Sequence, residues 1–240
     1  YFFSPYQFVA CLKNFLKEYA KPSSYHVNFR LHDIRDLQNF SLYDLYILDR
    51  DCTLQGYHAK TRVPEFEKIL KEKSPQSELV SNSSYDELLR IRDILGDIMP
   101  VSKLVKINGF TQPFLLRFVN GKLTVLRMDY NNVTDVTRTM SRGDRLYDKI
   151  TYNFQKPDPK IIKAVITANK ITGRIPRNPR ILMVGDRYLT DIVAGNLACI
   201  ETARVKPYKP FTDKPDLIAT RYLLDSPIGN IMSRILQPKE

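Results

Sequence analysis

Short apolar runs alternate with segments of helical periodicity along this chain. Residues 45–48 form an unbroken apolar run, which is typical of a strand buried in a parallel sheet. Pro64 opens a segment with apolar residues at helical spacing, and a second strand candidate follows at 78–82. Another helix begins at Ser84, with Glu87 at capping-box spacing. This β-α-β-α order predicts a parallel sheet whose strands are joined by helical crossovers.

The alternation is interrupted between residues 104 and 150. Two β-prone runs at 114–119 and 122–128 flank Asn120-Gly121, the strongest dipeptide signal for a two-residue hairpin turn. We therefore predict an inserted β-hairpin with a basic, polar tail at 138–149. The alternation then resumes, and the further predicted elements are a helix at 160–171, a strand at 180–184, a helix at 189–199, a strand at 200–205, a short strand at 217–220 and a C-terminal helix containing Ile228, Ile231 and Ile235.

The first 42 residues precede this pattern. Residues 5–20 have an apolar stripe at helical spacing with lysines beside it, which predicts an amphipathic helix that either docks on the domain core or lies on a membrane surface. Residues 22–43 look like an irregular connector with a short helical turn at 32–37. The patterns divide the chain into an N-terminal helix and connector (1–42), a core (43–103 and 151–225), an insertion (104–150) and a C-terminal helix and tail (226–240).

The composition narrows the choice of partners. Lys and Arg number 37 against 26 Asp and Glu, a formal charge of +11, which favours acidic lipid headgroups, nucleic acid or phosphorylated substrates. No apolar run reaches the roughly 18 residues that a membrane-spanning helix needs. The cysteines lie far apart and the histidines lack metal-ligand spacing, so the sequence indicates neither a zinc site nor a disulfide framework, and a reducing compartment fits.

Polar side chains lie at the ends of the predicted core strands. In open α/β sheets, ligands bind at the carboxyl ends of the strands, and the two-residue period of an extended chain puts alternate residues on one side. The residues at these positions are Asp49 and Asp51, then Ser81 and Asn82, then Lys156, then Asp186 and Asp191. Taken singly, each also has an ordinary interpretation as a helix cap, a charged turn or an exposed loop.

Together, these residue types form the set that phosphoryl transfer through a covalent intermediate requires. That chemistry needs a carboxylate nucleophile, an acid/base, a hydroxyl and a cation for the phosphoryl oxygens, and ligands for a magnesium ion. Two carboxylates repel a phosphate unless Mg²⁺ and a lysine intervene. The set is more specific than any member, so we predict a phosphoryl-transfer site.

The segments DRDCT, VSN, KP and GDRYLTD resemble the four motifs of haloacid dehalogenase (HAD) superfamily phosphatases, over a core from about residue 43 to 205. The resemblance implies an α/β, three-layer Rossmann-like fold with a mainly parallel sheet, here with the inserted β-hairpin. It also implies Mg²⁺-dependent hydrolysis of a phosphate monoester.

The resemblance assigns roles to the acids. Asp49 would be the nucleophile that forms an aspartyl phosphate, and Asp51 would protonate the leaving alcohol and then activate water. Mg²⁺ would be held by Asp49, the backbone carbonyl of Asp51, and Asp186. Asp191 would support the metal shell or orient Lys156.

The resemblance also assigns contacts to the phosphoryl group. Ser81 would hydrogen-bond a phosphoryl oxygen, and Lys156 would offset the charge that builds there and on the nucleophile. Asn82 and Arg187 are the other expected substrate contacts.

Within the superfamily, HDIRDL, VSNSS, QKP and residues 185–196 resemble the mitochondrial phosphatidylglycerophosphate phosphatases and their bacterial relatives. That resemblance implies conversion of phosphatidylglycerophosphate to phosphatidylglycerol in cardiolipin synthesis. It implies a location on the matrix side of mitochondria, associated with the inner membrane, with residues 5–20 as the peripheral membrane contact.

Departures from that family lead to a second hypothesis. The family usually has Asp-Lys-Asp-Asn at the positions of residues 49–52, so Arg50 replaces the lysine and Cys52 replaces the asparagine. Arginine keeps the charge of lysine but not its geometry, and cysteine forms only weak hydrogen bonds. The basic insertion 104–150 is either a substrate cap or a docking surface for protein or RNA. The alternative is a HAD-fold protein recruited as a structural or assembly subunit of a mitochondrial complex such as the mitoribosome, with weak or no catalysis.

Overall fold

The computed structural model describes residues 22–40, 42–56, 60–83, 85–129, 132–140 and 146–208, together with residues 225, 228, 230 and 231. The predicted helix at 5–20, the predicted strand at 217–220 and the Ser84 capping position lie outside these residues, as does most of the predicted C-terminal helix. None of the helices in the described ranges is long and apolar enough to cross a membrane.

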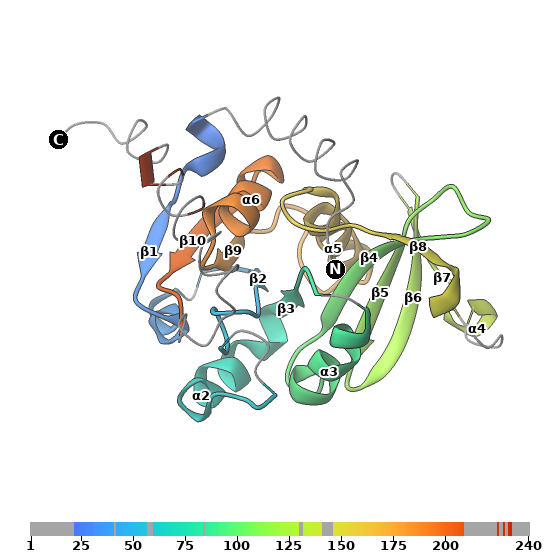
Figure 1. Ribbon diagram of the computed structural model, residues 1–240, viewed down its shortest axis with the longest axis horizontal. Helices are drawn as coiled ribbons and strands as arrows, with labels where there is room; N and C mark the ends of the chain where they lie inside the picture. Colours follow the sequence, from blue (N-terminus) through green and yellow to red (C-terminus); the bar gives the residue numbers. More distant parts are fainter. Residues whose placement is uncertain are drawn as a thin grey trace.

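The fold is built on a ten-stranded sheet with the order β1-β10-β9-β2-β3-β4-β5-β6-β7, and β8 pairs with β4 (Figure 1). Pairs between β1 and β4 are parallel, whereas the pairs that β4 makes with β5 and β8, and all pairs beyond them, are antiparallel. The strands are β1 (Phe29–Leu31), β2 (Leu45–Leu48), β3 (Ser77–Val80), β4 (Val101–Ile107), β5 (Phe114–Val119), β6 (Lys122–Asp129), β7 (Asn132–Asp135), β8 (Ile150–Asn153), β9 (Ile181–Gly185) and β10 (Glu201–Val205).

Helices cover both faces of the parallel part, which gives the molecule three layers (Figure 1). Apolar residues of α2 (Pro64–Lys73) and α3 (Tyr85–Leu95) pack with Tyr46 and Leu48, while those of α5 (Lys160–Ile171) and α6 (Val193–Leu197) pack with Leu45 and Ile47. Because both faces of β2 are buried, its apolar run is unbroken. The shorter helices are η2 (Pro22–Tyr25), η3 (Ile34–Asn39), η4 (Ser74–Gln76), α4 (Thr137–Met140), η5 (Tyr147–Lys149) and the π-helix η6 (Tyr188–Ile192).

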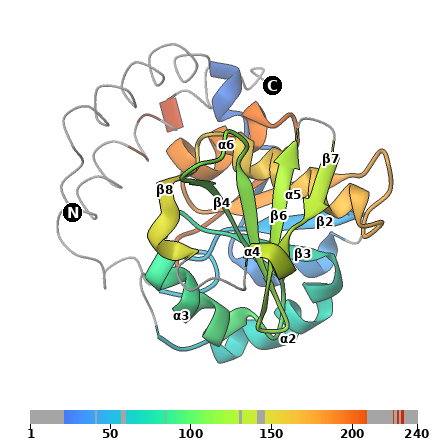
Figure 2. The ribbon, with the colours of Figure 1, turned by 90° about the vertical axis from the view of Figure 1, so that its right-hand side faces the viewer.

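The predicted hairpin is present and extends the central sheet. β5 and β6 pair on either side of Asn120 and Gly121, whose φ angles of 50° and 72° are the left-handed values that a two-residue hairpin turn requires. β5 pairs directly with β4, so the hairpin continues the parallel sheet as an antiparallel extension, which faces the viewer in Figure 2. The extension has its own apolar cluster, which includes Val105, Phe114 and Val125.

A buried polar network joins this extension to the parallel core. Glu78 of β3 is fully buried, and its carboxylate accepts hydrogen bonds from Arg117 of β5 (2.8 Å), Asn169 of α5 (2.7 Å) and Arg174 (3.2 Å), and from the Ser102 hydroxyl of β4. Buried carboxylates are tolerated when they are paired and hydrogen-bonded in this way.

The structure confirms the α/β class with a mostly parallel, mixed sheet, but it differs from the sequence predictions in places. The connector at 22–43 contains β1, a three-residue edge strand that is too short to show a period. β3 ends at Val80, so Ser81 and Asn82 belong to the following loop. The boundary set at residue 104 falls inside β4, whereas the division into domains stays a prediction.

Candidate active site

Two carboxylates lie side by side where β2 and β9 end. Asp49 directly follows β2, and its N–H donates to the carbonyl of Val184 at 2.9 Å, so the pairing with β9 reaches this residue. Asp186 directly follows β9. The two acids are 7% and 1% exposed, at the sheet edge where α/β proteins bind ligands.

A third carboxylate, that of Asp191, reaches the same place from η6. The π-helical turn lets the N–H groups of Asp191 and Ile192 both bond the carbonyl of Arg187, at 3.1 and 3.2 Å. The Asp191 carboxylate in turn accepts from the Arg187 N–H at 3.1 Å. A Cβ added at Gly185 would collide with the Asp191 side chain, so a glycine is needed here.

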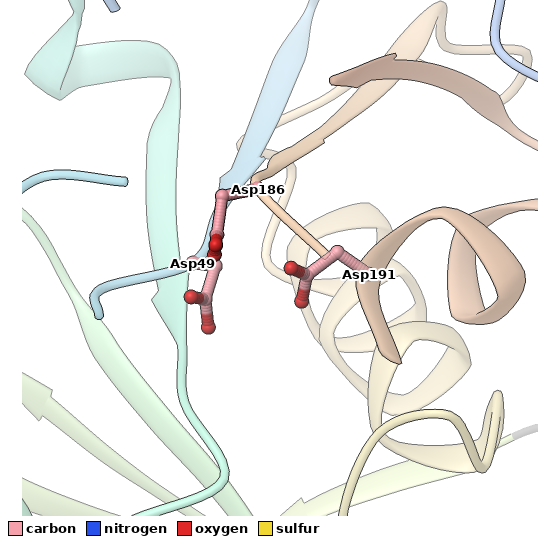
Figure 3. Close-up of side chains that lie close together, drawn as sticks. All are labelled: Asp49, Asp186 and Asp191. Atoms are coloured by element: carbon pink, nitrogen blue, oxygen red, sulfur yellow. The ribbon is translucent and has the colours of Figure 1, made fainter. Parts of the chain in front are cut away.

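The three carboxylates form a cluster that fits a metal ion. Each of Asp49, Asp186 and Asp191 offers an oxygen, these oxygens lie within 4.8 Å of one another, and all three side chains are buried (Figure 3). Carboxylate oxygens are the ligands that Mg²⁺ prefers. Burial, and then the neighbouring Asp191, raise the pKa of Asp49 against the opposing influence of Lys156. Three buried acids beside one lysine repel one another, and a divalent cation would remove that repulsion.

Lys156 is the cation of the cluster. Its ammonium donates to Asp49 and, at 2.6 Å, to Asp191, and the residue is 3% exposed. Burial alone would lower the pKa of Lys156, but the Asp191 and Asp49 carboxylates outweigh burial and raise it, so the side chain is charged at neutral pH. Asp191 is thus in direct contact with Lys156, and its role in orienting that lysine or in supporting the metal shell stays a prediction.

Lys156 reaches the site from an unexpected direction. It lies in the loop between β8 and α5, and β8 runs antiparallel to β4, so Lys156 does not follow a parallel core strand as we had predicted. Asn82 fixes this loop: its amide nitrogen donates to the Lys156 carbonyl (2.8 Å) and its amide oxygen accepts from the Lys156 N–H (2.7 Å). Asn82 thus joins two loops, and its contact with a substrate stays a prediction.

Ser81 lies in the loop after β3 and is 3% exposed. Its hydroxyl oxygen is 2.8 Å from the hydroxyl oxygen of Ser83 and accepts from the Ser83 N–H at 3.3 Å. Gln155 donates to the Asn82 carbonyl at 3.1 Å, which links this loop to the Lys156 loop a second time. The structure therefore connects Ser81 to the Lys156 side of the site.

Asp51 is placed differently from the other acids. Its side chain is not among the clustered carboxylates; it lies against Arg50, whose Nε and Nη2 donate to its two oxygens at 2.9 Å each. Arg50 is fully buried and also donates to Glu87 of α3 at 2.6 Å. Sequence reasoning assigned Glu87 to a helix cap and did not detect this ion pair, because 37 residues separate the partners.

A further carboxylate, that of Asp225, braces the η6 turn. Asp225 is 1% exposed and accepts from the N–H groups of Tyr188 (3.2 Å) and Leu189 (2.7 Å). The guanidinium of Arg187, next to Asp186, lies 4.0 Å from the same carboxylate. The η6 turn is also held from β10, because Arg204 donates to the Asp186 carbonyl at 3.2 Å and lies over the Tyr188 ring. The sequence carried no local signal for these long-range contacts.

Part of this site lies in a segment that is similar to a known class of domains. A family model described as HAD-hydrolase-like matches residues 153–209, a range that contains Lys156, Asp186 and Asp191. Comparisons with curated proteins and with solved structures gave no significant match. The matched domain supports membership of the HAD superfamily and a hydrolase of the phosphatase kind, in agreement with the Rossmann-like sheet.

Proposed function

We propose that this protein is a Mg²⁺-dependent phosphatase that hydrolyses a phosphate monoester through an aspartyl phosphate on Asp49. The observation that carries the proposal is the cluster of Asp49, Asp186 and Asp191, with oxygens within 4.8 Å of one another and Lys156 bonded to two of the three. The HAD-hydrolase-like match over residues 153–209 supports the same chemistry.

The proposed reaction has two displacements at phosphorus. A carboxylate oxygen of Asp49 attacks, the bond from phosphorus to the ester oxygen breaks, and Asp51 gives a proton to the departing alcohol. Asp51 then takes a proton from water as that water attacks the aspartyl phosphate; the bond from phosphorus to the Asp49 oxygen breaks, which releases inorganic phosphate and restores the carboxylate. Lys156 and the Ser81 hydroxyl stabilise the charge on the phosphoryl oxygens. Mg²⁺, when bound by Asp49, Asp186 and Asp191, supplies the positive charge that lets a phosphate dianion approach these acids.

The proposed substrate is a phospholipid phosphate, namely phosphatidylglycerophosphate, which would yield phosphatidylglycerol for cardiolipin. The resemblance of VSNSS, QKP and residues 185–196 to that phosphatase family supports this choice, and the +11 charge suits an anionic lipid surface. We further propose that the protein acts on the matrix side of mitochondria and that residues 5–20 contact the inner membrane.

The test uses vesicles containing phosphatidylglycerophosphate and measures released phosphate with and without Mg²⁺. We expect Mg²⁺-dependent release by the wild type and a loss of more than about a hundredfold in Asp49→Asn, because the nucleophile is removed. Asp93→Asn is the matched control, since Asp93 is an exposed acid of α3 outside the site, and it should retain activity. Equal release by wild type and Asp49→Asn would refute the proposal.

A second candidate is a recruited HAD-fold subunit of a mitochondrial assembly, with weak or no catalysis. The observation that favours it is the pairing of Asp51, the expected acid/base, with the buried Arg50. Deleting residues 104–150 would remove most of β4 and all of β5, β6 and β7, so charge reversal at the exposed Arg138 of α4 is the better test. Loss of association with protein or RNA, with phosphate release retained, would identify the insertion as a docking surface.

A further inference from the structure

Lys103 is a buried lysine that the proposed reaction does not use. It lies on β4, which is paired in parallel with β3, and the register that matches Val80 with Ser102 puts Lys103 one residue further along, beside the loop that starts at Ser81. Lys103 is fully buried, and its ammonium donates to the carbonyl of Ser83. That carbonyl belongs to the loop whose Ser81 hydroxyl is the expected phosphoryl contact.

Charged side chains of α3, the helix that packs against β4, contact groups other than Lys103. On α3, which packs against β4, Glu87 bonds Arg50 at 2.6 Å and lies 3.4 Å from Arg90, and Arg92 lies over the ring of Phe118 on β5. Within the part of the chain that the structure describes, no ion pair joins Lys103 to a carboxylate. Burial accordingly lowers the pKa of Lys103 to about 8.

A buried ammonium without a carboxylate partner disfavours folding, and an apolar side chain would fill the same place without that penalty. A positive charge behind the Ser81–Ser83 loop attracts a phosphate dianion bound in front of that loop, because the interior screens charges weakly. We infer that Lys103 is a positioning residue of the phosphoryl site: it anchors the Ser81–Ser83 loop and supplies a positive charge behind it, so that protonation of Lys103 and binding of the phosphoryl group favour each other. This inference rests on the proposed function.

The direct test measures the pKa of Lys103 by NMR in the full chain with labelled lysines and Mg²⁺, with and without inorganic phosphate. Binding linkage is reciprocal, so a phosphate affinity about tenfold higher for the charged lysine corresponds to a rise of about one pH unit in the pKa of Lys103. We expect a rise of at least about that size, whereas the NMR signal of Lys106, the exposed lysine of the same strand, should not respond to phosphate.

Calorimetric measurement of phosphate affinity in variants tests the same link between protonation of Lys103 and phosphate binding. Wild-type affinity for phosphate should fall between about pH 7.5 and pH 9.5 as Lys103 loses its proton. Lys103→Met should bind phosphate about tenfold more weakly at pH 7 and lose that pH dependence, while Lys106→Met should match the wild type. The NMR measurement needs no variant, so it decides even if Lys103→Met does not fold.

Phosphate binding that leaves the pKa of Lys103 unchanged would overturn the inference and leave the proposed function standing. A wild-type chain that binds no phosphate in the presence of Mg²⁺ would overturn both.

Discussion

At the scale of single residues, Cys52 is held in an unfavourable backbone conformation. Its φ angle is 58°, in the left-handed region where asparagine is better tolerated than most residues, and asparagine is what the resembled family usually has there. The conformation is fixed by two backbone hydrogen bonds, from the Cys52 N–H to Gln55 and from the Tyr208 N–H to the Cys52 carbonyl, each 2.7 Å long. The turn that carries Asp51 is therefore formed despite its cysteine.

Cys199 offers a matched comparison, because its φ is 60° and it is exposed. We expect Cys199→Asn to raise the free energy of unfolding by about 1 kcal/mol through relief of this backbone strain. Cys52→Asn should gain less, because Cys52 is fully buried and desolvating the amide opposes the gain. Urea unfolding measures the change in the free energy of unfolding for each of the two variants. A larger increase for Cys52→Asn than for Cys199→Asn would show that the buried amide finds hydrogen-bond partners at position 52.

At the scale of elements, the hairpin extension depends on the parallel core through Glu78. Arg117 of β5 crosses to this carboxylate on β3, so the ion pair spans β4 and ties the antiparallel strands to the part of the sheet that holds the site. Both side chains are nearly inaccessible, at 8% and 0% exposure. Solvent therefore screens the pair little, and loss of one partner leaves a buried charge.

We expect Arg117→Met to lower the free energy of unfolding by about 3 kcal/mol, since Glu78 loses one of its charged partners inside the protein. Arg127→Met on β6 is the control: Arg127 pairs with Asp129 at 3.3 Å with both side chains more than 30% exposed, and its loss should cost less than about 1 kcal/mol. Urea denaturation compares the two, and equal effects would mean that the buried network does not stabilise the extension.

At the scale of the whole molecule, stability should depend on the metal and on pH together. Without Mg²⁺, burial and Asp191 raise the pKa of Asp49 above the value it has in the unfolded chain, about 4. At pH values between the unfolded-state pKa and the folded-state pKa of Asp49, the folded state binds more protons than the unfolded state. The stability of the folded state therefore falls as pH rises from the lower to the higher of these pKa values. A bound cation stabilises the ionised form and removes this loss.

Thermal unfolding at acidic and at mildly alkaline pH, each with Mg²⁺ and with a chelator, tests this expectation. Mg²⁺ should raise the melting temperature more at the higher pH, where the unmetallated acids repel most. Asp49→Asn should reduce the Mg²⁺ effect and weaken its dependence on pH. A Mg²⁺ effect of the same size at both pH values would contradict the assignment of the cluster as a metal site.

The sequence by itself determined several of the elements and the kinds of group at the sheet edge, whereas β1, β4, β7 and β8 were not predicted. The apolar run of β2, the helical period of α5 and the Asn120-Gly121 turn are local signals, and local sterics and burial fix them without knowledge of distant residues. The order of the acids, the hydroxyl and the lysine along the chain could also be read from the sequence, because each of these residues lies next to a predicted element.

Only the tertiary structure decided which groups meet. Lys156 bonds Asp49 across 107 residues and Asn82 across 74, through a strand that returns antiparallel to β4. The pairing of Arg50 with Glu87, the place of Lys103 behind the Ser81 loop and the support from Asp225 depend likewise on strand order and register. Periodicity along a chain specifies what an element buries, but not which distant element it is buried against.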